Sequence, residues 1–431
     1  MPTVEARYIS RLTRKTLAVV LAGGRGSRLG VLTDWRTKPA VPFAGKFRII
    51  DFTLSNCLNA DIRKVCVLTQ YKSHSLIQHL MKGWTFLNSE HQDFLDLIPA
   101  QQWRDEDSWY EGTADAVHQC MDIINGYGPE YVLILAGDHV YTMDYGAMLA
   151  THVESNASFT IACKTVAVAD ATEFGVMKVD DSGRIVSFQE KPENPEPLPR
   201  DESQALVSMG IYVAPLSFLS EQLNRDAGDT ASIHDFGKDV IPYMLANGDR
   251  VQSHTFTSPT DDEAYWRDVG TIDAFFQANI EQLSPPSPIN LHDPAWPILT
   301  HHPQLPPAHL LGKPGSCCFG SSMISAGCIV DSSSLANSML FSNVSVDAGC
   351  KLDHVLALPG CRIGAGSRLT NVILDNQCQI PDGTIIGEAA VDDEQRFDVT
   401  PGGVTVVNRE MLGQGVHYIP GGSPHELDSG D

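Results

Sequence analysis

A glycine-rich turn flanked by basic residues is the part of this chain best suited to chemistry. It follows the β-branched apolar run 16–21 and reads AGGRGSRL over residues 22–29. Three glycines within four positions let backbone N–H groups approach an anion, and Arg28 and Lys38 add positive charge. A dinucleotide fingerprint needs glycine where this chain has Leu29. The pair Gly45-Lys46 is no P-loop either, because the earlier glycine is replaced by Ala40 and the following Ser or Thr by Phe47. The pattern therefore predicts a triphosphate cradle of neither common type.

Two aspartates stand where a divalent cation could bind. Asp138 leaves the apolar run 131–136, and ligands of a doubly wound sheet bind outside the carboxyl ends of its strands. Asp268 lies in a similar turn before a helical stretch. Carboxylate oxygens suit Mg²⁺, which accompanies nucleotide phosphates. The alternative for Asp138 is a helix N-cap, and the second carboxylate favours the metal.

A second set of polar residues follows later strands. Lys191 precedes Pro192, which keeps the lysine out of a helix and in an extended conformation. Taken alone, such a lysine is more often a solvated strand end. Together with the runs SMGIY at 208–212 and DFGKD at 235–239, it becomes a candidate pocket for a sugar and its phosphate.

The elements that must position these residues predict an α/β fold. Apolar runs alternate with amphipathic stretches over residues 16–280, which is typical of a doubly wound, mostly parallel, Rossmann-like sheet. Parallel core strands are expected at 64–69, 131–136 and 159–163. The runs 175–179 and 184–188 flank a turn, which predicts a hairpin.

Nine prolines between residues 284 and 314 exclude a helix or a central strand there, so we expect a semi-rigid linker. The expected division is therefore a catalytic domain over 1–283, a linker over 284–314 and a second domain over 315–431.

In the second domain aliphatic residues return about every six positions. A six-residue repeat gives one short strand and one corner per repeat, and three repeats close a triangular coil. This predicts a left-handed parallel β-helix that serves assembly and regulation, whereas a β-sandwich would alternate with a period of two. The positions expected to face inward are Leu340, Val346, Leu352, Leu358, Ile363, Leu369, Leu374, Ile380 and Ile386.

The composition excludes several partners. A formal net charge of -23 over 431 residues repels nucleic acid and anionic membranes. No apolar run approaches the roughly 20 residues of a membrane span, and the N-terminus lacks the apolar core of a signal peptide, so we expect a cytoplasmic protein. The ten cysteines include no C-x-x-C pair, which predicts buried thiols, with a redox role left open for Cys317 and Cys318.

Eight motifs together resemble the sugar-nucleotidyltransferases and, among these, the bacterial glucose-1-phosphate adenylyltransferases, or ADP-glucose pyrophosphorylases. The similarity covers nearly the whole chain, and it implies that ATP and glucose 1-phosphate give ADP-glucose and pyrophosphate for glycogen synthesis. The motifs are the turn 21–29, KPAV at 38–41, FRIIDF at 47–52, WYEGTADA at 109–116, LAGDH at 135–139, FQEKP at 188–192, HDFG at 234–237 and WRDVG at 266–270.

The resemblance also implies roles for individual residues. Arg28, Lys38 and Asp138 would be catalytic, and Asp138 and Asp268 would hold Mg²⁺. ATP would be bound by Leu21, Ala22, Gly23, Gly24, Gly26, Gln70, Tyr110, Gly112 and Thr113. Glucose 1-phosphate would be bound by Gly175, Glu190, Lys191, Ser208, Tyr212 and Asp235. A homotetramer and phosphorylated metabolite effectors are the further partners that the resemblance implies.

The chemistry of such a reaction needs no general base. A sugar phosphate has a second pKa of about 6, so it is already an anionic nucleophile at neutral pH. The difficulty is to bring two anions in line. Arg28, Lys38 and Mg²⁺ would neutralise the triphosphate, while Lys191 would fix the attacking oxygen.

Three other functions stay open. A uridylyl- or thymidylyl-transferase would differ only in a few hydrogen bonds to the base. A regulatory paralogue with reduced activity would be marked by substitutions at Arg28, Lys38 or Asp138, and all three are present. A hexapeptide acyltransferase would need a catalytic histidine, and the regular coil offers only His354.

The region of the activator departs from the related sequences. In members activated by fructose 1,6-bisphosphate, a lysine stands where this chain has Trp35, a histidine stands at Pro42, and an arginine pair stands at residues 125–126, here Asn-Gly. Arg36 and Arg48 remain as candidate regulatory anion ligands. We therefore expect a weak response to fructose 1,6-bisphosphate.

Overall fold

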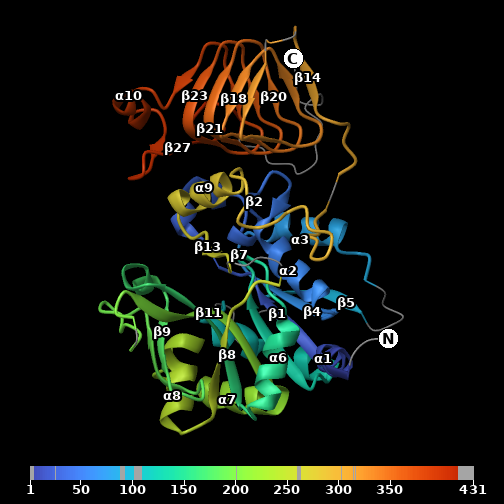
Figure 1. Cartoon of the computed structure of the whole chain (residues 1–431), viewed down its shortest axis with the longest axis vertical. Helices are drawn as coiled ribbons and strands as arrows, with labels where there is room; N and C mark the ends of the chain where they lie inside the picture. The colour runs from blue at the N-terminus through green and yellow to red at the C-terminus, as the bar shows by residue number, and fades with distance from the viewer. Residues whose placement is uncertain are drawn as a thin grey trace.

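The chain folds into an α/β part and a β-helical part, stacked along the long axis of the molecule (Figure 1). The computed structural model describes residues 4–24, 26–87, 93–100, 109–199, 201–259, 264–301, 303–313, 315 and 317–415.

The α/β part is built on a nine-stranded sheet with the order β10-β9-β11-β6-β1-β4-β5, in which β8 also pairs with β11, and β12 pairs with β8. Strands β6, β1, β4 and β5 are parallel, and β11 runs antiparallel to β6. The strands are β1 (Thr16–Leu21), β4 (Lys64–Thr69), β5 (Phe94–Pro99), β6 (Tyr131–Ala136), β8 (Phe159–Ala167), β9 (Gly175–Val179), β10 (Ile185–Glu190), β11 (Gln204–Pro215) and β12 (Val251–Thr255).

The sheet confirms the mostly parallel α/β fold and the hairpin, which is the antiparallel pair β9 and β10. The expectation for residues 159–163 is only partly right. Strand β8 is parallel to β12 but antiparallel to β11, because β11 inserts in the opposite direction between β8 and β6. Strand β1 alternates between two cores: Leu17 and Val19 lie in one apolar cluster, and Ala18 and Val20 lie in the other. This double burial explains why the strand is apolar throughout.

Helices cover both faces of the sheet. Residues of α4, α5 and α7 pack in the first cluster, and residues of α2, α3 and α6 pack in the second. The helices are α1 (Val4–Arg14), α2 (Ile49–Asn59), α3 (His74–Gly83), α4 (Thr113–Gln119), α5 (Met121–Tyr127), α6 (Tyr145–Glu154), α7 (Leu216–Ala227), α8 (Ile241–Ala246), α9 (Ile272–Glu281) and α10 (Ala390–Glu394). Two small ribbons complete this part: β2 (Pro42–Phe43) with β3 (Phe47–Arg48), and β7 (His139–Tyr141) with β13 (Trp266–Asp268).

The C-terminal part is a parallel β-helix, and all nine predicted inward positions are buried. The central coils advance by 17 residues, as from Lys351 to Arg368, whereas an earlier coil advances by 16, as from Ile329 to Ser345. Around a coil of 17 residues, successive inward-facing aliphatic residues are therefore separated by two steps of six residues and one of five, and the three repeats of a coil are not equal in length. Its strands are β14 (His309–Leu311), β15 (Cys318–Gly320), β16 (Met323–Ile324), β17 (Ile329–Asp331), β18 (Ser334–Ala336), β19 (Met339–Leu340), β20 (Ser345–Val346), β21 (Lys351–Ala357), β22 (Arg362–Ile363), β23 (Arg368–Leu374), β24 (Gln379–Ile380), β25 (Ile385–Ile386), β26 (Asp398–Val399) and β27 (Thr405–Val407).

The two parts share an apolar core. Phe43 and Phe275 of the α/β part lie in one cluster with Phe341 and Leu358 of the β-helix, and β2 and α9 lie on the side that faces the β-helix (Figure 1). This shared burial joins the two parts over an apolar surface.

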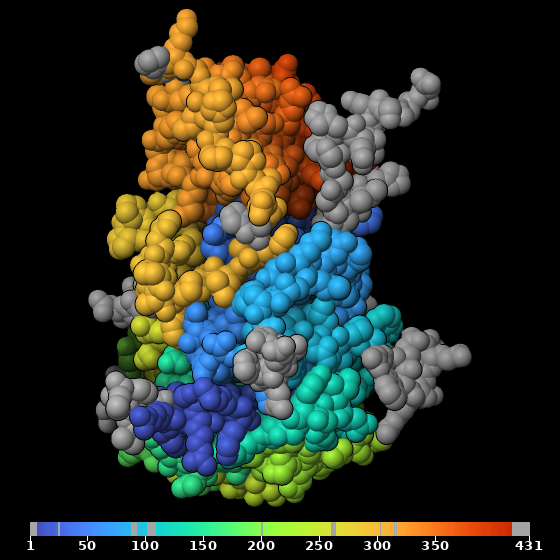
Figure 2. Space-filling view, turned by 90° about the vertical axis from the view of Figure 1, so that its right-hand side faces the viewer, coloured from blue at the N-terminus to red at the C-terminus, as the bar shows by residue number. Residues whose placement is uncertain are grey.

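The proline-rich stretch runs over the α/β part, in front of the residues coloured blue in Figure 2, toward the β-helix. The Asn59 side chain donates to the Pro297 carbonyl oxygen at 3.0 Å, and the Trp296 indole N–H donates to Asn56 at 2.9 Å. Strand β14 lies inside the stretch expected to be a linker, where it pairs with β17. The expected domain limits stay a prediction.

Eight cysteines are buried and free, which confirms the prediction of buried thiols; Cys317 is half-buried and Cys318 is exposed. Among the described residues, no helix has the length and apolar character needed to span a membrane.

Candidate active site

The glycine turn lies where β1, β4 and β6 end. The Ala22 N–H donates to the Leu68 carbonyl oxygen at 2.9 Å, and the Gly137 N–H donates to the Leu21 carbonyl oxygen at 3.0 Å. Gly26 has a φ of 62°, and a Cβ built on it would lie 2.8 Å from the Cβ of Lys38. Glycine is therefore needed for the turn to approach the lysine. Arg25 lies outside the described residues.

Lys38 joins the two predicted metal-binding carboxylates. Its Nζ lies 2.5 Å from Asp268 Oδ1 and 3.0 Å from Asp138 Oδ2, and the residue is only 5% exposed. A buried ammonium needs such counter-charges because removing it from water is costly. The structure thus brings together Lys38, Asp138 and Asp268, which are far apart in the sequence.

The meeting of the two aspartates follows from the ribbon formed by β7 and β13. In its register Asp268 faces His139, the residue after Asp138. The helix N-cap alternative for Asp138 is wrong, because a strand follows it and Asp144 caps the next helix by accepting the Gly146 N–H.

Burial and the neighbouring charges shift the pKa values of Asp138 and Lys38. Burial alone would raise the pKa of the Asp138 carboxyl, but the Lys38 ammonium and His139 hold that pKa below its ordinary value. Burial would lower the pKa of Lys38, and the two carboxylates raise it instead. The Asp138 carboxylate and the Lys38 ammonium are therefore charged at neutral pH.

Arg28 approaches the same cluster from the half-exposed side. Its Nη2 lies 3.7 Å from Asp268 Oδ2, and its Nη1 donates to Glu173 Oε2 at 2.8 Å. Sequence reasoning missed Glu173, since nothing in its local pattern marks it.

A cavity of about 240 Å³ opens at this cluster. Its lining includes the predicted site residues Leu21, Gly23, Gly24, Gly26, Lys38, Thr113, Asp138 and Tyr212. Pro39, Ala136 and Gly210 also line it, although they were predicted only as members of longer motifs and not as individual site residues. Gly210 has a φ of 67° and lies in an irregularity of the pairing between β11 and β8. The sequence signal for Gly210 is a glycine inside a strand-like run, which often marks a bulge or a close approach of the backbone to a ligand.

The other four residues predicted to bind ATP lie around this cavity or near α4. Gln70 contacts the turn, since a Cβ on Gly23 would be 3.1 Å from its Cβ. Tyr110 is half-buried and its hydroxyl lies 3.5 Å from Cys120 Sγ. Gly112 directly precedes α4, and Ala22 is buried at the end of β1.

The residues predicted to bind the sugar phosphate form a neighbouring group. Glu190 faces Gly175 across the hairpin, and Cβ atoms built on Gly175 and Gly237 would lie 2.9 and 2.5 Å from its Oε2. Burial and the charge of Asp235 raise the pKa of Glu190. Ser208 is buried on β11. Lys191 follows β10 and is exposed, and the extended conformation expected for it is wrong, because its φ of 46° lies in the left-handed region.

Tyr212 links this group to the cavity. It lines the cavity on one side, and its ring lies 5.3 Å from that of Phe236, the residue after Asp235. The two predicted pockets are therefore adjacent.

The candidate regulatory arginines lie outside this cluster. Arg36 is buried and pairs with Asp375 of the β-helix, and its Nη1 donates to Asn376 Oδ1 at 3.1 Å. The Arg48 guanidinium donates to the Ala40 carbonyl oxygen at 2.6 Å. Their regulatory role stays a prediction.

Fold and site place the chain among the nucleotidyl transferases. The profile described as Nucleotidyl transferase matches residues 17–284, and the profile described as GlmU-like, C-terminal hexapeptide matches residues 306–407. The chain is 51% identical to the glucose-1-phosphate adenylyltransferase of Nitrosomonas europaea over 96% of its own length and 97% of that protein. It is also 51% identical to the enzyme of that name from Nitrosococcus oceani, over 96% and 98% of the two chains. The chain belongs to the glucose-1-phosphate adenylyltransferase family.

Proposed function

We propose that this enzyme transfers the adenylyl group of ATP to glucose 1-phosphate, with ADP-glucose and pyrophosphate as products, for glycogen synthesis. The observation that carries the proposal is the convergence of Lys38, Asp138 and Asp268 beside the glycine turn. The names of the relatives support the choice of substrates.

In this reaction a phosphate oxygen of glucose 1-phosphate attacks the α-phosphorus of ATP, and the bond from that phosphorus to the β-phosphate bridge breaks. The nucleophile is already an anion at neutral pH, so no side chain has to remove a proton. Lys38 and Arg28 offset the negative charge on the triphosphate, and the glycine turn offers backbone N–H groups to it. The second pocket, with Lys191, Glu190 and Asp235, holds the sugar phosphate against the α-phosphorus.

The carboxylates fit a divalent cation. Asp138, His139 and Asp268 offer ligand atoms that all lie within 4.8 Å of one another. Two carboxylates are a donor set that Mg²⁺ prefers, and we propose that Asp138 and Asp268 hold it. When bound, the ion would stabilise negative charge on the phosphates. Lys38, which is bonded to the same two carboxylates, keeps them close together and oriented.

The test is an assay of the purified full-length chain with glucose 1-phosphate, Mg²⁺ and each of ATP, UTP and dTTP. We expect ADP-glucose and pyrophosphate to form with ATP far faster than either competing sugar nucleotide. Lys38→Ala should remove this activity. A preference for UTP or dTTP would contradict the proposed base, and an inactive wild-type chain would favour the regulatory paralogue.

A homotetramer is also proposed. It is supported by exposed apolar side chains on the first coils of the β-helix, namely Leu310, Leu311, Phe319 and Ile329. Light scattering on the purified chain should give four times the chain mass, and a monomer would contradict the proposal. The cytoplasmic location stays a prediction.

A further inference from the structure

The start of α4 is bonded to the backbone of His234, which precedes Asp235. The His234 carbonyl oxygen accepts the N–H groups of Ala114 at 2.9 Å and of Asp115 at 3.2 Å. These amides belong to the first turn of α4, where no partner exists within the helix. A Cβ on Gly112 would lie 2.1 Å from the same oxygen, so only glycine allows this approach.

Side chains reinforce the connection. The Thr113 hydroxyl donates to Asp235 Oδ2 at 3.0 Å and accepts the Phe236 N–H at 3.1 Å. Thr113 lines the cavity beside the glycine turn, and Asp235 belongs to the proposed sugar-phosphate pocket. The bonds therefore join the nucleotide side of the site to the sugar side.

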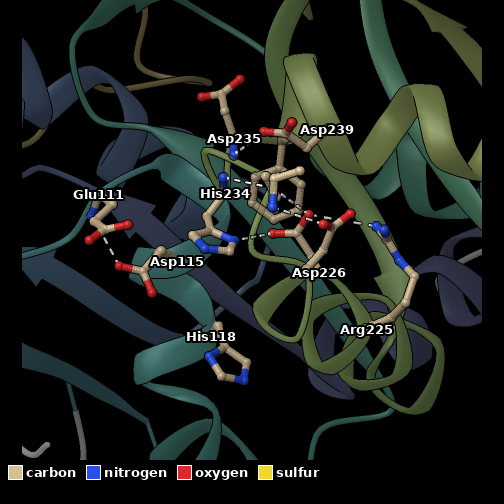
Figure 3. Close-up of polar contacts among 12 residues, drawn as sticks. Glu111, Asp115, His118, Arg225, Asp226, His234, Asp235 and Asp239 are labelled. Carbon is tan, nitrogen blue, oxygen red and sulfur yellow. Dashed lines mark hydrogen bonds and ion pairs between the residues drawn. The ribbon is translucent and has the colours of Figure 1, made fainter.

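The backbone of His234 needs support to make these bonds. Its φ of 58° lies in the left-handed region, which is unfavourable for a residue with a side chain. Its Nδ1 donates to Asp226 Oδ2 at 2.9 Å, and its N–H donates to the Ser232 hydroxyl at 2.9 Å. The Ser232 hydroxyl donates in turn to Asp226 Oδ1 at 2.9 Å. Figure 3 shows Asp226 between His234 and Arg225.

Asp226 is well placed to hold the histidine. It is 2% exposed, and a buried carboxylate requires hydrogen bonds and positive charge. Arg225 Nη2 lies 3.7 Å from it, while the Arg225 guanidinium also stacks on Tyr243. The hydrogen bond from His234 completes the polar environment of Asp226. The same hydrogen bond raises the pKa of His234, and the nearby carboxylates of Asp115 and Glu111 raise it further.

We propose that Asp226 and His234 are a positioning pair that holds both substrate pockets in register. The pair fixes the left-handed turn, the turn bonds the start of α4, and Thr113 and Asp235 are thereby kept at a constant spacing. This inference rests on the proposed function, because it needs a nucleotide at one end and a sugar phosphate at the other. Neither Asp226 nor His234 lines the cavity, so their effect is exerted through the backbone.

The experiment compares three variants with a control on α4, the helix that the His234 carbonyl oxygen binds. His234→Ala and Asp226→Asn should each raise the apparent KM for ATP and for glucose 1-phosphate about tenfold. This factor corresponds to the lower end of the free-energy range for losing a hydrogen bond to a charged group. The change in kcat should be smaller. His234→Asn should remain close to wild type, because asparagine tolerates a positive φ and its amide can donate to Asp226. The control is His118→Ala, which removes a half-buried histidine whose Nε2 lies 3.2 Å from Asn224 Oδ1. This change should alter neither KM.

Calorimetric titration of ATP into each variant supplies a readout that does not depend on turnover. Weaker ATP binding in His234→Ala, restored in His234→Asn, would support the pair. Unchanged ATP binding and unchanged KM values in a folded His234→Ala would overturn it, as would a loss of kcat alone. If wild type formed no ADP-glucose, the proposed function would fail, while the ATP titrations would still test the pair. If His234→Ala did not fold, Asp226→Asn and His234→Asn would carry the comparison.

Discussion

The dipeptide Asp-His occurs at a strand end in the α/β part and again in the β-helix, and the two copies have different surroundings. In the β-helix, Asp353 and His354 are bonded to each other, with His354 Nδ1 2.8 Å from Asp353 Oδ1. In the α/β part, the His139 nitrogen that approaches Asp138 is Nε2, and it lies 3.7 Å from Oδ1. The better hydrogen-bonded pair is thus the one outside the candidate active site.

Asp138 differs from Asp353 in the charged side chains that surround it. Lys38 lies 3.0 Å away, and the same lysine binds Asp268. Asp353 is about half-exposed, and it also accepts a hydrogen bond from the Asn337 amide at 3.4 Å. The difference between the two aspartates therefore comes from charged side chains that converge on Asp138 from distant segments, and the shared local sequence does not produce it.

The largest effect should come from breaking the cluster in the α/β part. Asp138→Asn is expected to lower kcat about 10³-fold with little loss of ATP affinity, because a metal-binding carboxylate acts mainly on charge in the transition state. Asp353→Asn is the matched change in the β-helix and should leave kcat unaltered. Steady-state kinetics with calorimetric ATP binding measures both. Near-normal turnover of Asp138→Asn would remove this residue from the metal site.

The next effect concerns the second pocket. Lys191→Gln should weaken binding of glucose 1-phosphate by about 10- to 150-fold, the cost of one charge-assisted contact to a phosphate. The KM for ATP should change far less, since Lys191 lies at the end of β10 and the glycine turn lies at the end of β1. Equal losses for both substrates would indicate a general defect of folding.

A difference in acid stability should also separate the two parts. Burial lowers the pKa of His152 in α6 to about 4, whereas His309 and His354 of the β-helix are not buried. The unfolded chain takes up this proton below a pH of about 6.5, so the folded α/β part loses stability as the pH falls from there toward 4. The loss from His152 is about 2 kcal/mol at pH 5.

Calorimetric unfolding at pH 7.5 and pH 5 of wild type and of His152→Gln measures this difference. The variant should show a smaller loss of stability on acidification. An equal loss in both proteins would mean that His152 does not titrate on unfolding.

A smaller effect is expected at the contact between the parts. Arg36 is already paired with Asp375, and the preceding residue, Trp35, is half-exposed at the position where we expect members activated by fructose 1,6-bisphosphate to carry a lysine. We expect weak activation by fructose 1,6-bisphosphate, because a missing charge contact moves an activation constant by about one to two decades. Trp35→Lys should recover part of the response in an activation curve. Strong activation of wild type at micromolar concentrations would contradict this account.

The smallest effect is expected at the histidine of the β-helix. His354→Ala should leave the adenylyl transfer rate unchanged, because its ring is bonded to an exposed aspartate far along the chain from the cluster. A large loss of adenylyl transfer in this variant would contradict the expectation. An assay with an acyl donor would then test the alternative that the β-helix is an acyltransferase.

Most of the fold could be predicted from local patterns. Strands β1, β4 and β6 are continuous apolar runs because both of their faces are buried, and the six-residue repeat of the β-helix follows from stacking one aliphatic residue per side of the coil. The glycine turn was also evident from sequence, because a positive φ and the contact of Gly26 with Lys38 require residues without a side chain.

The tertiary structure alone decided which polar residues act together. Pairing of β7 with β13 brings Asp268 to Asp138, a bend after the glycine turn brings Lys38 between them, and the closure of the two parts pairs Arg36 with Asp375. The left-handed His234 and the ion pair of Glu173 with Arg28 left no mark in the local sequence. A periodic pattern reports which face of an element is buried, whereas contacts between distant segments depend on sheet order and register.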